Sequence, residues 1–339
     1  MSRATIQSIA THVPEAVLTN DELAGRFGNW TASEVFKKTG ICERHIAAFG
    51  ECASDLALAA AKKLIDSQRL NPCAVDALLF CTQAPDYILP TTACLLQDRL
   101  GLPKSILALD FNLGCSGYIV GLSLAKGLIE SGQVRTVLLL TADTYSKFIH
   151  PMDRSVCTLF GDGASATVIT ATDDQSKGLQ TFLFGTDGKG AKELIVPAGG
   201  CRTPRSSQTA IPMTDADGNI RTANNLYMNG REVFRFAITT VPKTVAQLME
   251  NDGLSKEMVD YLVLHQANRY MIEELIRKMQ WPSTKVPMHI EGIGNTVSSS
   301  IPFMLEQMLT DGRLTPGKKI LLVGFGVGYS WAGCSVVWS

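Results

Sequence analysis

The chain has 339 residues, 45% of them hydrophobic and 19% charged, which suffices for two ordinary domains or one large duplicated domain with a sizeable core. A formal net charge of −1 argues against a global electrostatic attraction to nucleic acid or to an anionic membrane surface. No stretch reaches the roughly 18 to 20 uninterrupted apolar residues of a membrane span, and we expect no signal peptide.

The nine cysteines are scattered along the chain and odd in number, and none forms a zinc-type pair. Several lie in apolar runs, which suits free thiols in a reducing compartment better than a disulfide framework. We therefore expect a cytoplasmic protein without a metal centre.

Strand-like apolar runs alternate with helical patterns along the first half of the chain. A strong helix is predicted over 53–66, where Ser and Asp precede one apolar face. The predicted strands cover 4–10, 75–85, 106–109, 135–143 and 161–171.

Cys115 follows an apolar run of strand length and a short Asn-Leu-Gly turn, and a helical pattern then continues to Gly132. This order predicts Cys115 at a strand-to-helix junction, in the first helical turn. There the helix dipole and the unpaired N–H groups favour a thiolate, and small neighbours leave the sulfur accessible. Taken alone, the stretch fits a catalytic nucleophile or a small buried cysteine.

Two segments of the first half each resemble a segment of the second half, and the distance along the chain is nearly the same in both pairs. VDYLVLHQAN at 259–268 resembles VDALLFCTQA at 75–84, and KKILLVGF at 318–325 resembles RTVLLLTA at 135–142. This spacing is too long for a solenoid repeat. The chain is therefore predicted to contain an internal duplication.

The duplication predicts two α/β halves, residues 1–172 and 173–339, each with a mainly parallel sheet covered on both faces. The segment of about 187–228 is rich in Gly, Pro, Thr, Ser and Asn, and we interpret it as an irregular excursion over the surface.

The repeat also predicts where chemically active side chains meet. The repeat spacing carries Cys115 onto the serines at 298–300, so the turns around Cys115 and Asn295 would face each other. His265 directly follows the buried run YLVL, at the carboxyl end of a predicted strand, where α/β sheets bind ligands. Singly, His265 fits a core histidine and Asn295 a turn residue. Together with Cys115 they form a candidate catalytic site.

Several motifs resemble the β-ketoacyl-acyl-carrier-protein synthase III family, within the thiolase superfamily, essentially from end to end. They are GCSG around Cys115, HQAN at 265–268, GNTVSSSIP at 294–302, FGDGASA at 160–166, GFGVGYSWAG near the C-terminus, TGICERHIAA at 39–48 and PTTACLLQDRLGL at 90–102. The resemblance implies a thiolase-like five-layered αβαβα fold with two pseudo-symmetric halves, usually in a homodimer. It also implies acyl-CoA and malonyl-acyl-carrier protein as substrates, with no cofactor.

The resemblance gives the matching residues their roles. Cys115 would take the acyl group from the primer thioester. His265 and Asn295 would donate hydrogen bonds to the malonyl thioester carbonyl as CO2 leaves. The backbone N–H groups of Cys115 and Val327 would hold the oxyanion during acylation, and Phe325 would lie over the cysteine while also packing in the core.

Other matching residues concern the CoA or carrier arm. Arg154, Arg235 and Asn268 match positions near that arm. The tryptophan that stacks on adenine in many members is missing from its usual place, and Trp30 lies one helical turn away. Leu89 stands where members vary a residue that borders the partner subunit's acyl pocket.

Two other functions remain open at this stage. The acyl-cysteine could pass its acyl group to an oxygen or nitrogen nucleophile in a specialised pathway, which the altered residues on the CoA side motivate. A non-enzymatic scaffold that binds CoA or a carrier is the third, although an intact Cys-His-Asn set argues against it. GFGVG is a weak nucleotide-binding signal, because a β-like terminus and not a helix follows it.

Overall fold

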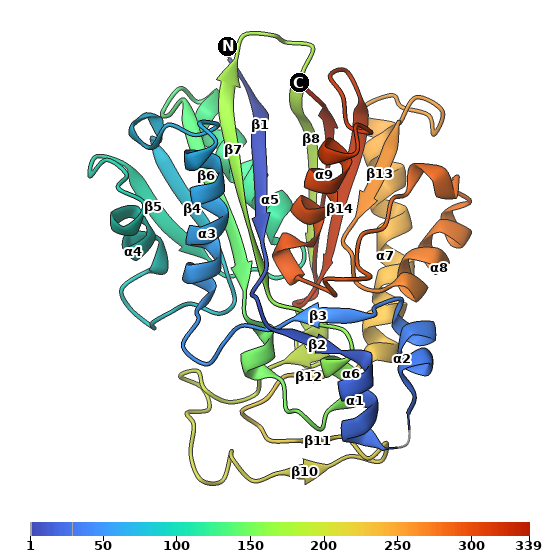
Figure 1. Ribbon diagram of the computed structural model, residues 1–339. Coiled ribbons are helices and arrows are strands. Elements are labelled where there is room, and N and C mark those ends of the chain that lie inside the picture. Colours follow the sequence, from blue (N-terminus) through green and yellow to red (C-terminus); the bar gives the residue numbers. More distant parts are fainter. Residues whose placement is uncertain (1, 29) are drawn as a thin grey trace.

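The computed structural model describes residues 2–28 and 30–339. Two sheets stand side by side with helices between them and a further layer of helices on each outer side (Figure 1). The five-layered αβαβα, thiolase-like order implied by the resemblance is confirmed.

The first sheet contains five strands, and two helices cover its outer face. In spatial order the strands are β1 (Arg3–His12), β7 (Gly163–Thr172), β6 (Thr136–Asp143), β4 (Ala77–Cys81) and β5 (Leu107–Phe111). The covering helices are α3 (Ala53–Asp66) and α4 (Thr92–Arg99). Alanines and leucines of α3 pack against this sheet in one hydrophobic cluster with residues of the strands and of α4.

The second sheet contains four strands, with two helices on its outer face. Its strands, in spatial order, are β13 (Tyr261–Leu264), β14 (Lys319–Gly326), β15 (Ser330–Val337) and β8 (Gly178–Thr186). The helices are α7 (Gly230–Asn251) and α8 (Arg269–Met279), which contact each other.

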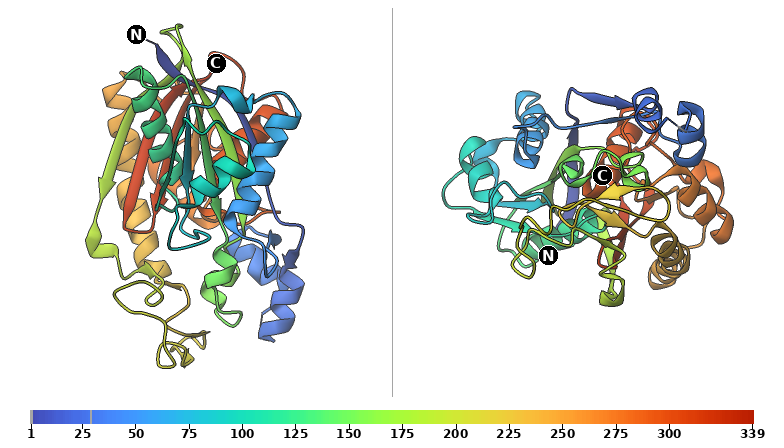
Figure 2. Two further views of the ribbon diagram at one scale, coloured as in Figure 1. Left: turned by 90° about the vertical axis from the view of Figure 1, so that its left-hand side faces the viewer. Right: turned by 90° about the horizontal axis from the view of Figure 1, so that it is seen from below.

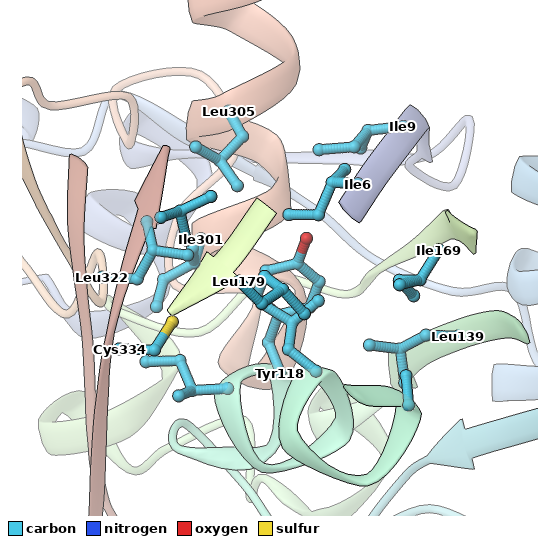
Figure 3. Close-up of a cluster of buried hydrophobic side chains, with 14 of the residues drawn as sticks. Ile6, Ile9, Tyr118, Leu139, Ile169, Leu179, Ile301, Leu305, Leu322 and Cys334 are labelled. Atoms are coloured by element: carbon cyan, nitrogen blue, oxygen red, sulfur yellow. The ribbon is translucent and has the colours of Figure 1, made fainter. Parts of the chain in front are cut away.

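The central layer consists of α5 (Gly117–Glu130) and α9 (Ser300–Thr310), which fill the space between the two sheets. Figure 3 shows Tyr118 of α5 and Ile301 of α9 among apolar side chains from both sheets. Both helices are apolar on most sides because each faces a sheet on two sides. Each helix begins at the edge of the site described below.

The expectation of mainly parallel sheets is wrong. β4 pairs in parallel with β5 and β6, and β13 with β14, but every other neighbouring pair in the two large sheets is antiparallel. A tight turn joins β14 to β15, and a short connection of this kind permits only antiparallel pairing. An apolar run predicts a buried strand but not its direction.

The segments that resemble each other take equivalent positions in the two sheets. β4 and β13 come from the first pair of similar segments, and β6 and β14 from the second. In each sheet the two strands are neighbours and parallel. The first sheet uses strands within residues 3–172 and the second within 178–337. The division into 1–172 and 173–339 stays a prediction.

The remaining elements gather below the two sheets, at one end of the molecule (Figures 1 and 2). They include β2 (Val17–Thr19), β3 (Glu43–His45), α1 (Asn20–Phe27), α2 (Ala32–Thr39) and α6 (Arg154–Cys157). The segment 187–228 runs over this end and contains a 3-10 turn at Gly188–Gly190 and two short strand pairs: β9 (Leu194–Ile195) with β12 (Tyr227–Met228), and β10 (Met213–Thr214) with β11 (Ile220–Arg221). None of the helices in the described part of the chain combines the length and apolarity needed to cross a bilayer.

Candidate active site

Cys115 lies in the turn between β5 and α5, beneath the end of β14. The helix begins at Gly117 with Ser116 as its N-cap, so Cys115 lies just before the first helical turn and not within it. A Cβ atom on Gly326 would stand 2.9 Å from the Cys115 sulfur, and one on Gly324 would stand 2.5 Å from the Cys115 carbonyl oxygen. Glycine at both positions is what allows β14 to pass so close to the nucleophile.

The prediction that Cys115 is a thiolate is wrong for the resting protein. Cys115 is only 6% exposed, and burial raises the pKa of its thiol, with a further increase from the carboxyl of Asp143. A hydrogen bond from the backbone N–H of Cys115 opposes this increase without cancelling it. Burial disfavours the charged sulfur more than the local backbone favours it, so the resting thiol is neutral.

His265 follows β13 and is held at both its backbone and its ring. Its backbone N–H donates to the carbonyl of Val323 at 2.8 Å. Its ring Nδ1 lies 2.6 Å from the hydroxyl of Ser300, the first residue of α9. The side chain is 1% exposed, and burial lowers the pKa of His265 to about 3. The imidazole is therefore neutral at physiological pH.

Asn295 is fixed by both its backbone and its side chain. It pairs with Phe160 in an isolated parallel bridge, in which the Asn295 N–H donates to Leu159 and the Asn295 carbonyl accepts from Gly161. Its Oδ1 accepts a hydrogen bond from the N–H of Val297 at 2.9 Å. Because this bond fixes the orientation of the amide, Nδ2 is the end that can donate to the cavity that Asn295 lines.

Cys115, His265 and Asn295 line one cavity of about 260 Å³. The prediction that these three side chains, which lie in turns and loops from both halves of the chain, share one site is confirmed. The rest of the wall is mainly apolar, formed by Leu159, Phe160, Leu194, Met228, Val233, Ala267, Met271 and Phe325. A neighbouring cavity of about 370 Å³ lies on another side of Phe160 and contains none of the three groups.

Phe325 belongs to β14 and lines the cavity together with Cys115, and its expected packing in the core is confirmed. Phe325 is 2% exposed, and its ring meets the His265 imidazole edge-on with centroids 5.6 Å apart. Val327 follows β14 and lies beside Gly114, the residue before Cys115. Its backbone N–H as an oxyanion donor stays a prediction.

Arg154 and Trp30 lie together, outside the cavity. The Arg154 guanidinium is 5.3 Å from the centre of the Trp30 ring, and the Lys38 ammonium is 4.3 Å from it. Arg154 also donates to the backbone carbonyl of Asp217, in the turn between β10 and β11. An indole with two cations beside it offers a flat surface and positive charge to a nucleotide.

The remaining predicted residues have other surroundings. Asn268 lines the cavity, but its amide oxygen caps α8 by accepting from Met271 N–H at 2.8 Å. Arg235 extends from α7 with a 75% exposed side chain and pairs with Glu232 at 3.5 Å. Leu89 is 78% exposed and does not line the cavity of its own chain.

Sequence reasoning missed two groups at this site. In the sequence Gly326 is only one glycine of a glycine-rich motif, although its missing side chain makes room for the Cys115 sulfur. In the sequence Ser300 is only one of three consecutive serines, although its hydroxyl contacts the His265 ring. The duplication itself held a signal for Ser300, because the repeat spacing carries the helix start after Cys115 onto the helix that Ser300 begins.

Known proteins resemble this chain over nearly its whole length. The family model described as 3-oxoacyl-[acyl-carrier-protein] synthase III matches residues 109–188, and the model of its C-terminal part matches 249–338. The curated β-ketoacyl-[acyl-carrier-protein] synthase III of Caldanaerobacter subterraneus is 36% identical over 336 residues, covering 99% of this chain and 98% of its own. That of Chlamydia caviae is 37% identical, covering 97% of this chain and 95% of its own.

Two solved structures are also similar to this chain over nearly its whole length. A crystal structure of a 3-oxoacyl-(acyl-carrier-protein) synthase III is 54% identical, with a TM-score of 0.97, and covers 99% of this chain and 100% of its own. A 3-oxoacyl-(acyl-carrier-protein) synthase from Burkholderia xenovorans is 37% identical, with a TM-score of 0.91, and covers 99% of this chain and 94% of its own. The chain belongs to the β-ketoacyl-acyl-carrier-protein synthase III family of condensing enzymes.

Proposed function

We propose that the chain condenses an acyl-CoA primer with malonyl-acyl-carrier protein, releasing CO2 and CoA. The observation that carries this proposal is the cavity in which a thiol, a neutral imidazole and a fixed amide meet. Membership of the family supports the same reaction. The first step moves the acyl group from one sulfur to another, and the second moves it from sulfur to carbon as CO2 leaves, so neither step needs a redox or metal cofactor.

In the first step the Cys115 sulfur attacks the primer carbonyl, and the proton of its thiol ends on the departing CoA thiol. Backbone N–H groups of Cys115 and Val327 are the proposed donors to the oxyanion. A buried, neutral thiol becomes nucleophilic only as it loses its proton, so we expect proton transfer to accompany the attack. The apolar wall of the cavity suits an acyl chain.

In the second step the malonyl thioester carbonyl accepts hydrogen bonds from His265 and Asn295. The bond to the carboxylate breaks, CO2 leaves, and the electron pair becomes an enolate that these donors stabilise. The enolate carbon attacks the acyl-cysteine carbonyl, and the Cys115 sulfur departs as a thiolate, which takes up one proton from solvent to restore the neutral thiol. A neutral donor suits this step, because the imidazole keeps its N–H over the whole physiological pH range.

The nucleotide of the donor is proposed to bind at Trp30, Arg154 and Lys38. The two cations complement phosphate charge, and the indole provides a surface for a base. Arg235 on α7 is a proposed contact for the carrier protein, because its side chain is exposed and basic.

A homodimer is the proposed assembly. β5 is the outermost strand of the first sheet, so one of its edges has no neighbouring strand among the described residues. Leu107 at its start is 43% exposed, and the loop of Tyr87, Ile88 and Leu89 is 61%, 95% and 78% exposed. A second copy pairing along β5 would cover this edge, and Leu89 would then border the partner's acyl pocket.

A cytoplasmic location of the protein is likewise a proposal.

The test is a screen of acyl-CoA donors, read by intact-protein mass spectrometry. The wild-type chain should gain the mass of one acyl group, and Cys115→Ala should gain none. Addition of malonyl-acyl-carrier protein should then remove the adduct. An adduct that is discharged only by an alcohol or an amine would show acyl transfer to oxygen or nitrogen, and no adduct with any donor would indicate a scaffold.

A further inference from the structure

The structure contains a buried hydrogen-bond chain that ends on the His265 ring. The three serines at 298–300 each contact a different partner. Ser298 donates to Asp143 at 2.7 Å, and the Ser299 hydroxyl contacts Thr141. Ser300 alone contacts the catalytic site, through the 2.6 Å contact to His265 Nδ1. Its hydroxyl also accepts from the backbone N–H of Gln266 at 3.3 Å.

We propose that Ser300 is a positioning residue that fixes the tautomer of His265, leaving the proton on Nε2, where the malonyl carbonyl is bound. This inference rests on the proposed function, because it assigns the atom with which His265 acts. It adds a residue that touches no reacting atom and acts only through the imidazole.

The argument follows from counting hydrogen-bond donors. The Gln266 N–H can only donate, so it occupies a lone pair of the Ser300 oxygen. The Ser300 proton then needs an acceptor, and among the described residues the only other contact of this hydroxyl is His265 Nδ1. The hydroxyl therefore donates to Nδ1, which must be unprotonated, and a neutral imidazole then carries its proton on Nε2.

The surroundings hold this chain in place. Ser300 and His265 are each 1% exposed, so water does not compete for either group. The side chain of Gln266 is also fixed: its Nε2 donates to the Leu264 carbonyl at 2.7 Å, and its Oε1 accepts from the His289 N–H at 2.8 Å. The Gln266 N–H therefore keeps its direction, and with it the hydroxyl of Ser300.

The assignment constrains the chemistry. With Nδ1 on Ser300 and the proton on Nε2, His265 donates into the cavity and cannot also accept the Cys115 proton there. We therefore expect loss of the Ser300 hydroxyl to impair decarboxylation, which uses the Nε2 proton, far more than acylation, which does not.

The direct test is ¹⁵N NMR of the full-length protein labelled at its histidines. The chain has five histidines, and comparison with His265→Ala assigns the signal. In the wild type we expect a protonated Nε2 and a bare, hydrogen-bonded Nδ1, unchanged between pH 5 and 8. A protonated Nδ1 in the wild type would overturn the proposal, whether or not the chain condenses malonyl thioesters.

Matched variants complete the test. Ser300→Ala should shift the His265 signal towards the other tautomer and lower the condensation rate by about 10- to 100-fold, by analogy with the loss of the groups that orient metal-bound histidines. Acylation should stay within about threefold of wild type, and Ser300→Thr, which keeps the hydroxyl, should restore the signal. Ser299→Ala removes an equally buried hydroxyl from the same run and should leave both the tautomer and the ratio of the two rates unchanged. A Ser300→Ala variant that folds and keeps the wild-type tautomer would contradict the assignment.

Discussion

Asn295 and Phe160 pair through their backbones in a two-residue bridge, although they come from opposite halves of the chain. This bridge places the Asn295 amide in the wall of the cavity that Phe160 also lines. The motifs around the two residues therefore form one structural unit, and the position of the amide is set by backbone contacts and not by a flexible side chain alone.

Replacing Asn295 should separate the two steps of the reaction. Asn295→Ala removes one donor to the developing enolate, so condensation should slow by about 100- to 1,000-fold, or roughly 3 to 4 kcal/mol in the barrier. Acylation by acyl-CoA should change little. Rapid-mixing measurements of each half-reaction provide the check.

Asn268 supplies the matched control, because it is a second asparagine in the same cavity wall. Its amide oxygen is used to cap α8, so Asn268→Ala should cost about 1 kcal/mol of stability and leave the ratio of the two half-reactions unchanged. Equal loss of condensation in the two variants would argue against the role proposed for Asn295.

The acidity of Cys115 should be visible in its reactivity. Because burial raises the pKa of this thiol, its alkylation by iodoacetamide in the free protein should keep rising with pH up to at least pH 9. Exposed cysteines such as Cys201 provide the internal comparison. Peptide mapping after timed alkylation measures both. If the alkylation rate of Cys115 levels off near neutral pH, the resting sulfur is a thiolate and the raised pKa is contradicted.

The Asp143 carboxyl should make the protein less stable as the pH rises. Burial raises the pKa of its carboxyl to about 7, against 3.8 for the unperturbed group, although Gln83 N–H and Ser298 donate to it. Between pH 4 and 7 the folded state thus binds more protons than the unfolded state, and this group's contribution to the free energy of unfolding decreases as pH rises.

Urea unfolding between pH 4.5 and 7.5 measures this effect. Asp143→Asn should flatten the dependence relative to the wild type, whereas Asp98→Asn, on the surface, should leave it unchanged. Identical slopes for wild type and Asp143→Asn would show that the Asp143 carboxyl stays ionised in the folded protein.

Trp30 should matter only for donors that carry a nucleotide. A base stacked on an aromatic ring is worth about 1 to 3 kcal/mol, so Trp30→Ala should raise KM for acyl-CoA by about 5- to 150-fold. Transfer from an acyl-pantetheine, which has no adenine, should be unaffected. The KM of Trp30→Phe for acyl-CoA should lie between those of the wild type and Trp30→Ala. Equal losses with both donors would place the nucleotide elsewhere.

Local patterns predicted the elements well. The helix expected over 53–66 is α3, Ala53–Asp66, because acidic and small residues at its start precede a single apolar face. The convergence of Cys115, His265 and Asn295 was also predictable, since the duplication and the strand ends together specify which turns meet.

The errors concern properties that depend on contacts across the fold. The resting charge of Cys115 depends on its burial beneath β14, which comes from the other half of the chain. Strand direction in the two sheets depends on connections that apolar runs do not encode. The contact between Ser300 and His265 joins residues 35 positions apart, and only the repeat spacing, not the serine run itself, separates Ser300 from its neighbours.

The most direct test of the condensing reaction follows a single turnover of the acylated enzyme. Purified acyl-enzyme is mixed with malonyl-acyl-carrier protein labelled at its free carboxylate, and released CO2 and β-ketoacyl product are counted together. The proposed mechanism predicts one CO2 and one β-ketoacyl thioester for each acyl group lost from Cys115. Loss of the acyl group without CO2, or CO2 without a β-ketoacyl product, would contradict it.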